Sequence, residues 1–172
     1  PPAAQQRAAR VDAAHLFACR LGVRGAADLV YVGPHRRRVA RVERRGHAAH
    51  RRDADALAKE LASLGYHLVS GGTDNHLMLL DLRPSHPDLT GKQAQQALEK
   101  ANVTLNRNTV PGETRSPFQT SGLRIGTPAV TSRGMETNEM KEIGSIIDLV
   151  IGDFENETVL ADAKEKTLAL SR

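Results

Sequence analysis

The sequence predicts an α/β domain in which helices pack on one side of a small mixed sheet. Three observations support this fold class: apolar residues recur at helical spacing in several segments, short apolar runs suited to strands lie between them, and polar clusters with glycine or proline separate the two. The 172-residue chain is long enough for one domain with a substantial core. Only 3% of its residues are aromatic, so that core must consist mainly of aliphatic side chains.

Charge divides the chain near Arg52. Residues 1–52 carry 12 arginines, no lysine and 3 acidic residues, for a net charge of +9, whereas residues 53–172 carry a net charge of −5. This difference predicts a boundary between residues 52 and 53, with a poorly ordered, Arg-rich arm before it and a folded domain after it. The arginine clusters could bind nucleic-acid phosphates, but no aromatic residue alternates with them to stack on bases, which favours a solvated arm.

The first regular segment begins at Asp53. Leucines recur at helical spacing after this capping residue, and Gly65 closes the segment, which predicts a helix of about three turns. Residues 66–70 then alternate like a short strand, and the apolar run 77–82 suits a strand buried on both faces. A tight polar turn over residues 71–75 joins these two strands.

A second helix is predicted from Thr90, its capping residue, to about Ala101, and residues 103–105 suit a further strand. The segment 106–122 has no apolar period and contains two prolines and two glycines. A structureless loop of this length inside a compact domain is more often functional than idle. Residues 123–126 then predict a strand exit, with Arg124 between two apolar neighbours.

Two helices complete the predicted domain. Apolar residues between Met135 and Val150 trace one helical face, which predicts the longest helix of the chain. A last helix is predicted from about Glu155 to Leu170, where it would dock on the sheet or on a partner chain.

Other features of the sequence limit the compartment and the partners. Cys19 is the only cysteine, so no internal disulfide can form, and the spacing of the histidines matches no zinc site. No apolar run approaches the length that crosses a bilayer, and the start of the chain lacks a signal-peptide pattern. We therefore expect a cytoplasmic protein without a metal or membrane partner. Because the chain begins with Pro1 and not with methionine, we also expect it to be cut from a longer protein.

Three strings in the second part of the chain resemble one enzyme family. They are S-G-G-T-D-N-H-L at residues 70–77, N-R-N-T-V-P at 106–111, and S-P-F-Q-T-S-G-L-R-I-G-T-P-A-V-T-S-R-G-M at 116–135. In their order and separation they resemble the C-terminal domain of serine hydroxymethyltransferase, over about residues 54–151. The resemblance implies the small domain of the aspartate aminotransferase-like fold, called fold type I, and a homodimer.

The resemblance also implies a chemistry. Serine hydroxymethyltransferases use pyridoxal phosphate to move a one-carbon unit between serine and tetrahydrofolate, which yields glycine and methylenetetrahydrofolate. By the same resemblance, Arg124 would grip the substrate carboxylate, and a guanidinium suits this role because it forms a planar two-point clamp. Without the surrounding string, Arg124 would be interpreted as an ordinary salt-bridge residue at a strand end.

The long loop would supply the folate site. The resemblance implies that Asn108, Ser116, Pro117 and Phe118 line this site, in keeping with a loop that can wrap around a flat heterocycle. The alternative is turn chemistry, because asparagine, serine and proline are common loop residues.

The arm matches the family only in part. Asp12 and His15 resemble the residues that meet the pyridine nitrogen and lie beside the cofactor. A pyridoxal phosphate enzyme also needs a lysine for the Schiff base, but the chain has His35 and Arg36 where the family has a His-Lys pair, and its first lysine is Lys59. An arginine stays protonated and cannot replace that lysine. We therefore predict an inactive fragment with no catalytic residue, in which covalent attachment of pyridoxal phosphate is lost and the N-terminal part is truncated or degenerate.

Two non-catalytic functions compete with this interpretation. The domain could be a folate- or subunit-binding module, which the long loop and the exposed helix faces would support. The Arg-rich arm could bind nucleic acid, with an affinity that falls steeply with salt. Since the chain lacks most of the large domain on which the family's C-terminal domain packs, exposed apolar surface and self-association are also expected.

Overall fold

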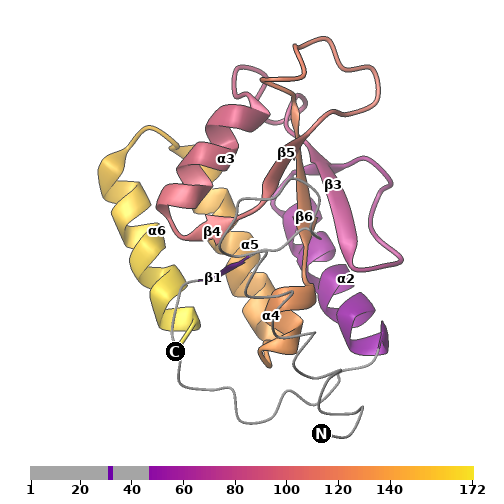
Figure 1. The fold of residues 1–172 in the computed structure, drawn as a ribbon, viewed down its shortest axis with the longest axis vertical. Helices are drawn as coiled ribbons and strands as arrows, with labels where there is room; N and C mark the ends of the chain where they lie inside the picture. The colour runs from indigo at the N-terminus through magenta and orange to yellow at the C-terminus, as the bar shows by residue number, and fades with distance from the viewer. Residues whose placement is uncertain (1–30, 33–46) are drawn as a thin grey trace, which may run out of the picture.

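The computed structural model describes residues 31–32 and 47–172, and within them four antiparallel strands form a sheet that is covered by helices (Figure 1). The order of the strands across the sheet is β2-β3-β6-β5. Their bounds are His67–Leu68 for β2, Leu77–Asp81 for β3, Asn106–Asn108 for β5 and Gly122–Gly126 for β6. A separate pair joins β1 (Tyr31–Val32) to β4 (Val103–Thr104), also antiparallel.

The predicted mixed sheet is therefore wrong for the described strands, because every neighbouring pair is antiparallel. Helix α3 (Gly91–Lys100) lies between β3 and β5 in the sequence, and such an alternation of strand and helix is typical of parallel neighbours. In the structure β6 inserts between β3 and β5 and runs antiparallel to both. Strands β3 and β5, on either side of α3 in the sequence, are therefore parallel to each other but are not neighbours in the sheet.

One face of the sheet forms the core. Met78 and Leu80 of β3 and Leu123 and Ile125 of β6 are buried, and they join side chains of helices α2, α3 and α5 in one hydrophobic cluster. Leu77 and Leu79 point to the opposite face and remain partly exposed. The prediction that this strand is buried on both faces is therefore wrong.

The first helix begins earlier than predicted. Helix α2 spans His47–Ser63, so residues 47–52, which were assigned to the arm, form its first turns. Asp53 is not a cap but lies inside the helix, fully buried, and its Oδ1 atom accepts hydrogen bonds from Arg52 at 3.0 and 2.9 Å. The helix ends as predicted, with Gly65 at a positive φ of 92° just beyond it. Within the arm, Tyr31–Val32 also form a strand, β1, and the expectation of disorder for its remaining residues, 1–30 and 33–46, falls outside the described part of the chain.

The other predicted helices are confirmed within a few residues. Helix α3 has Thr90 as its N-cap, whose hydroxyl accepts from the backbone N–H of Gln93. Helix α5 spans Thr137–Gly152; it was predicted to be the longest helix, but with 16 residues it is shorter than α2, which has 17. Helix α6 spans Glu157–Leu170 and is capped by Asn156. A short helix, α4 (Pro128–Ser132), was not predicted, although proline is common at the first helical position. Helix α5 packs against α2, α3 and α6 and is the central helix of the domain (Figure 1).

Few large apolar side chains of the described residues are exposed. Among the described residues, Leu64 and Phe118 are the large apolar side chains that are exposed. None of the described helices combines the length and the apolar character that crossing a membrane requires.

Candidate functional site

Strand β6 places Arg124 on the face of the sheet opposite the core. Its neighbours Leu123 and Ile125 are buried, and side chains alternate between the two faces of a strand. Arg124 pairs with Leu79 of β3 on one side and with Asn106 of β5 on the other. The residue therefore lies in the middle of a strand at the centre of the sheet, rather than at a strand exit as the sequence suggested.

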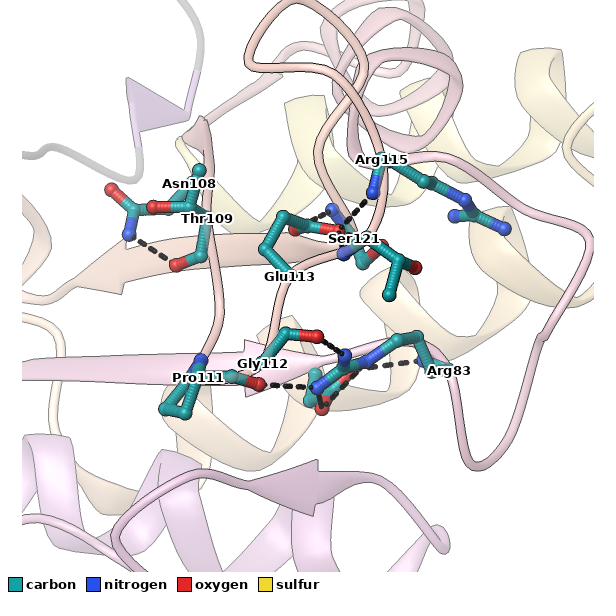
Figure 2. Close-up of polar contacts among 10 residues, drawn as sticks. Arg83, Asn108, Thr109, Pro111, Gly112, Glu113, Arg115 and Ser121 are labelled. Atoms are coloured by element: carbon teal, nitrogen blue, oxygen red, sulfur yellow. Dashed lines mark hydrogen bonds and ion pairs between the residues drawn. The ribbon is translucent and has the colours of Figure 1, made fainter.

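Asn108 lies on the same face as Arg124. It is two residues beyond Asn106 in β5 and pairs with Gly122, so it is a diagonal neighbour of Arg124 across adjacent strands. Its side-chain nitrogen donates to the carbonyl of Thr109 at 2.8 Å (Figure 2). The structure thus brings together the predicted carboxylate-binding residue and one of the predicted folate-binding residues.

The loop that follows β5 approaches this face closely. A Cβ atom at Gly122 would lie 2.5 Å from Cγ1 of Val110 and 2.9 Å from the carbonyl oxygen of Leu80, so only glycine fits under the start of the loop. Val110 is itself buried.

The segment 106–122, predicted to be a structureless loop, contains a strand: residues 106–108 form β5, and the loop starts at residue 109.

Arg83 fastens the start of the loop to the sheet. Its guanidinium donates to both oxygens of Asp81, the closest contact being Nη2 to Oδ2 at 2.7 Å. The same group donates to the carbonyls of Gly112 from Nη1 and of Pro111 from Nη2, each at 2.8 Å (Figure 2). One side chain thereby joins the end of β3 to two consecutive loop carbonyls.

Glu113 closes the loop on itself. Its carboxylate accepts from the backbone N–H groups of Thr114 at 3.1 Å and Arg115 at 3.0 Å, and from both the N–H and the hydroxyl of Ser121 at 2.8 Å (Figure 2). Because Ser121 immediately precedes β6, this single carboxylate ties the entry of the loop to its exit.

Four further hydrogen bonds hold the loop on helix α3 and on the segment before it. The Arg115 guanidinium donates to the carbonyl of Leu89 at 2.6 Å and also to that of Pro87. At the start of α3, the backbone N–H groups of Gly91 and Lys92 donate to the carbonyls of Thr120 and Gln119, at 3.1 and 3.0 Å. These two amides belong to the first helical turn, whose N–H groups have no partner within a helix, so the loop satisfies them.

The loop tip carries the remaining predicted folate residues. Ser116, Pro117 and Phe118 are exposed, and the carbonyl of Ser116 accepts from the N–H groups of Gln119 and Thr120. The Phe118 side chain is 78% exposed. The loop projects past the end of the sheet (Figure 1), so its tip lies beyond the row that contains Arg124.

The two carboxylates of this network titrate below their ordinary range. Burial alone would raise the pKa of Asp81, but the hydrogen bonds and the charge of Arg83 outweigh it and lower the pKa. Burial would likewise raise the pKa of Glu113, and the hydrogen bonds from Arg115, Ser121 and Val110 lower it instead. Both groups are therefore held as carboxylates at neutral pH.

Acidification is expected to loosen the loop. A carboxyl whose pKa is lower in the folded than in the unfolded chain stabilises the fold above its unfolded pKa of about 4, and this contribution is lost as the pH falls through the folded value. Thermal melts monitored by circular dichroism between pH 7 and pH 3 should show a fall in melting temperature below about pH 4 that is shallower in the Glu113→Gln variant. Glu142→Gln, on an exposed position of α5, is the control. An equal fall of melting temperature with pH in the wild type and in both variants would contradict the expectation.

The other predicted sites lie elsewhere. Asp12 and His15, expected at the cofactor, are outside the described residues. A shallow hollow between α3 and the α5–α6 connection does not include Arg124 or the loop; its lining residues are Gln93, Gln96, Ala97, Glu99, Lys100, Phe154 and Glu155.

Sequence reasoning missed the residues that hold the loop. It pointed to the tip and the strand but not to Arg83, Glu113 or Arg115. A signal was available, because Arg83 stands two residues after Asp81 at a strand end, and Glu113 lies next to a Pro-Gly pair in a loop whose backbone N–H groups need acceptors.

The fold and this face define a small α/β domain that presents an arginine beside a loop fixed by hydrogen bonds. The family model described as serine hydroxymethyltransferase matches residues 43–147. The chain belongs to the serine hydroxymethyltransferase family.

Curated relatives agree with this assignment. The chain is 51% identical to serine hydroxymethyltransferase of Halorubrum lacusprofundi over 118 residues, which is 69% of this chain and 28% of the relative. It is 54% identical over 119 residues to the enzyme of Nitrosococcus oceani and 47% identical over 120 residues to that of Haloquadratum walsbyi, with similar shares of each chain. The chain thus spans less than a third of the length of the curated relatives it matches.

Proposed function

We propose that this chain binds the ligands of serine-glycine interconversion without catalysing that reaction alone. The domain would be the small domain of fold type I, with Arg124 holding the amino acid carboxylate and Asn108 and the loop tip contacting tetrahydrofolate. The observation that supports this most is the arrangement of Arg124 and Asn108 on one face of the sheet, beside a loop that is fastened to the same strands. A guanidinium and a carboxylate form two parallel hydrogen bonds that fix the position of the ligand.

Covalent attachment of pyridoxal phosphate does not fit the described residues. All described lysines are exposed on helices, and three of them are engaged in ion pairs with neighbouring acids: Lys59 with Asp55, Lys100 with Glu157, and Lys166 with Asp162. None of these described lysines belongs to the sheet that carries Arg124. We infer that a lysine from outside this chain would be needed for the family's reaction.

The absence of catalysis by the chain alone can be measured directly. Purified chain mixed with pyridoxal phosphate, serine and tetrahydrofolate should show no aldimine absorbance band and should produce no glycine. Borohydride reduction followed by peptide mass spectrometry should find no lysine with a reduced cofactor adduct. A lysine that is trapped in high yield at one position, together with glycine formation, would contradict the proposal.

Ligand binding is the second measurable consequence. Tetrahydrofolate and serine should each raise the melting temperature of the chain, because a ligand that binds only the native state stabilises it by an amount that grows with the logarithm of the ratio of ligand concentration to dissociation constant. Arg124→Lys should lower the affinity for serine about tenfold or more, since an ammonium cannot form the planar two-point clamp. The shift in melting temperature caused by serine should therefore shrink, while the shift caused by tetrahydrofolate stays largely unchanged. An unchanged response of this variant to serine would remove Arg124 from the site.

A second candidate function is a folate-binding module that acts without any amino acid ligand. It is favoured by the loop, whose anchoring hydrogen bonds come from this chain itself. A response to tetrahydrofolate without any response to serine, in the wild-type chain, would select this candidate.

A further inference from the structure

We propose that Arg83 and Glu113 are positioning residues for the folate ligand: they hold the loop so that its tip presents a preformed surface to a flat heterocycle. This inference rests on the proposed folate function and deepens it, because it assigns the affinity for folate to two residues that need not touch the ligand.

Arg83 forms the junction between the sheet and the start of the loop. Its guanidinium is shared between one carboxylate on the sheet and two carbonyls on the loop, all at 2.7 to 3.2 Å. Asp81 is 8% exposed in its side chain, which leaves few other partners for its charge. A planar guanidinium can satisfy these acceptors at once, whereas a lysine offers one point charge. The start of the loop is therefore bonded to the end of β3.

Glu113 joins the two arms of the loop. The carboxylate accepts from residues on both arms of the loop, Thr114 and Arg115 on one side and Ser121 on the other. Hydrogen bonds that involve a charged acceptor are about twice as strong as neutral ones. Removing this group would leave the amide and the hydroxyl of Ser121, which is fully buried, without this acceptor.

The tip of the loop is exposed to solvent. Between these two anchors, residues 116–118 carry no side-chain hydrogen bond to the rest of the described domain, and the Phe118 ring is 78% exposed. An aromatic ring that is held outward at a fixed position suits stacking against a flat heterocycle, and a preformed loop avoids the cost of ordering on binding. Arg124, by contrast, is held by strand pairing and does not depend on the anchors.

The experiment uses the full chain and two kinds of measurement. Wild type, Arg83→Gln and Glu113→Gln are compared with Arg172→Gln and Glu142→Gln, which make the same charge changes at exposed positions. Hydrogen exchange is followed at the loop amides and at the amides of α5, and the dissociation constants of tetrahydrofolate and of serine are measured by calorimetry. We expect exchange of the loop amides to accelerate at least tenfold in both anchor variants, with α5 unchanged. The affinity for tetrahydrofolate should fall at least fivefold, while that for serine stays within twofold.

Other outcomes would contradict separate parts of the proposal. Unchanged loop exchange would overturn the positioning role, and faster loop exchange with unchanged affinity for tetrahydrofolate would overturn its link to folate. A parallel loss of protection in α5, or a parallel loss of serine affinity, would show that the anchors merely support the fold. If the wild-type chain bound serine but no tetrahydrofolate, the proposed folate function would fail, whereas faster loop exchange in the anchor variants would still support the positioning of the loop.

Discussion

Replacing Gly91 by alanine is expected to destabilise the domain by about 3 kcal/mol and to displace the loop. A Cβ atom at this position would lie 2.5 Å from Oγ1 of Thr120 and 2.7 Å from the carbonyl oxygen of Gly122. Neither neighbour can move freely, because Gly122 belongs to the central strand β6 and the Thr120 carbonyl accepts the N–H of Gly91 itself. The first turn of α3 must therefore separate from the loop and the sheet, which forfeits the hydrogen bonds between them.

Urea denaturation monitored by circular dichroism would measure this loss. Gly152→Ala provides a matched control, since a Cβ there meets nothing within 4 Å, and it should change the free energy of unfolding by less than about 1 kcal/mol. Equal stability of the two variants would mean that the start of α3 does not pack on β6 as closely as the structure shows.

Replacing Ile147 by alanine is expected to cost about 4 kcal/mol of stability. Ile147 is fully buried in α5, the helix that packs against α2, α3 and α6, so a cavity here would weaken several contacts at once. The domain has few aromatic side chains to fill such a space, and its core depends on aliphatic residues of this size. The variant should therefore unfold at a clearly lower urea concentration than the wild type.

The control for this change is Glu142→Ala, on an exposed position of the same helix, which should stay within about 0.5 kcal/mol of the wild type. A loss below about 1 kcal/mol for Ile147→Ala would indicate that the core around α5 collapses around the missing atoms or is loosely packed.

The helices were predictable from the sequence because their signals are local. The cap at Thr90, the glycine after α2 and the apolar face of α5 each act within a few residues. The start of α2 was missed because the capping tendency of Asp53 resembles a helix start, whereas its burial beside Arg52 depends on tertiary packing. The sheet direction was missed for a similar reason: pairing between β3 and β6 joins residues more than forty positions apart, and no local pattern reports it.

The candidate site divides in the same way. Arg124 and the loop could be predicted, because a charged residue between apolar neighbours and a long segment without an apolar period can both be recognised from the order of the residues alone. The bonds from Arg83 to residues 111 and 112 connect segments 28 and 29 positions apart, and their partners are backbone carbonyls, which no sequence pattern marks. Side chains that recognise backbone atoms leave little trace in composition, so only the structure shows them.

The early start of α2 has a practical consequence for dissecting this protein. A truncation placed at the change of charge, between residues 52 and 53, would cut through the middle of a helical turn and leave the buried Asp53 as a frayed terminus without the Arg52 guanidinium. Loss of function in such a truncated protein would then report damage to the folded part and not a role of the arginines. Cutting before His47 keeps α2 over its described residues and, of the other described elements, removes only β1 with its pairing to β4.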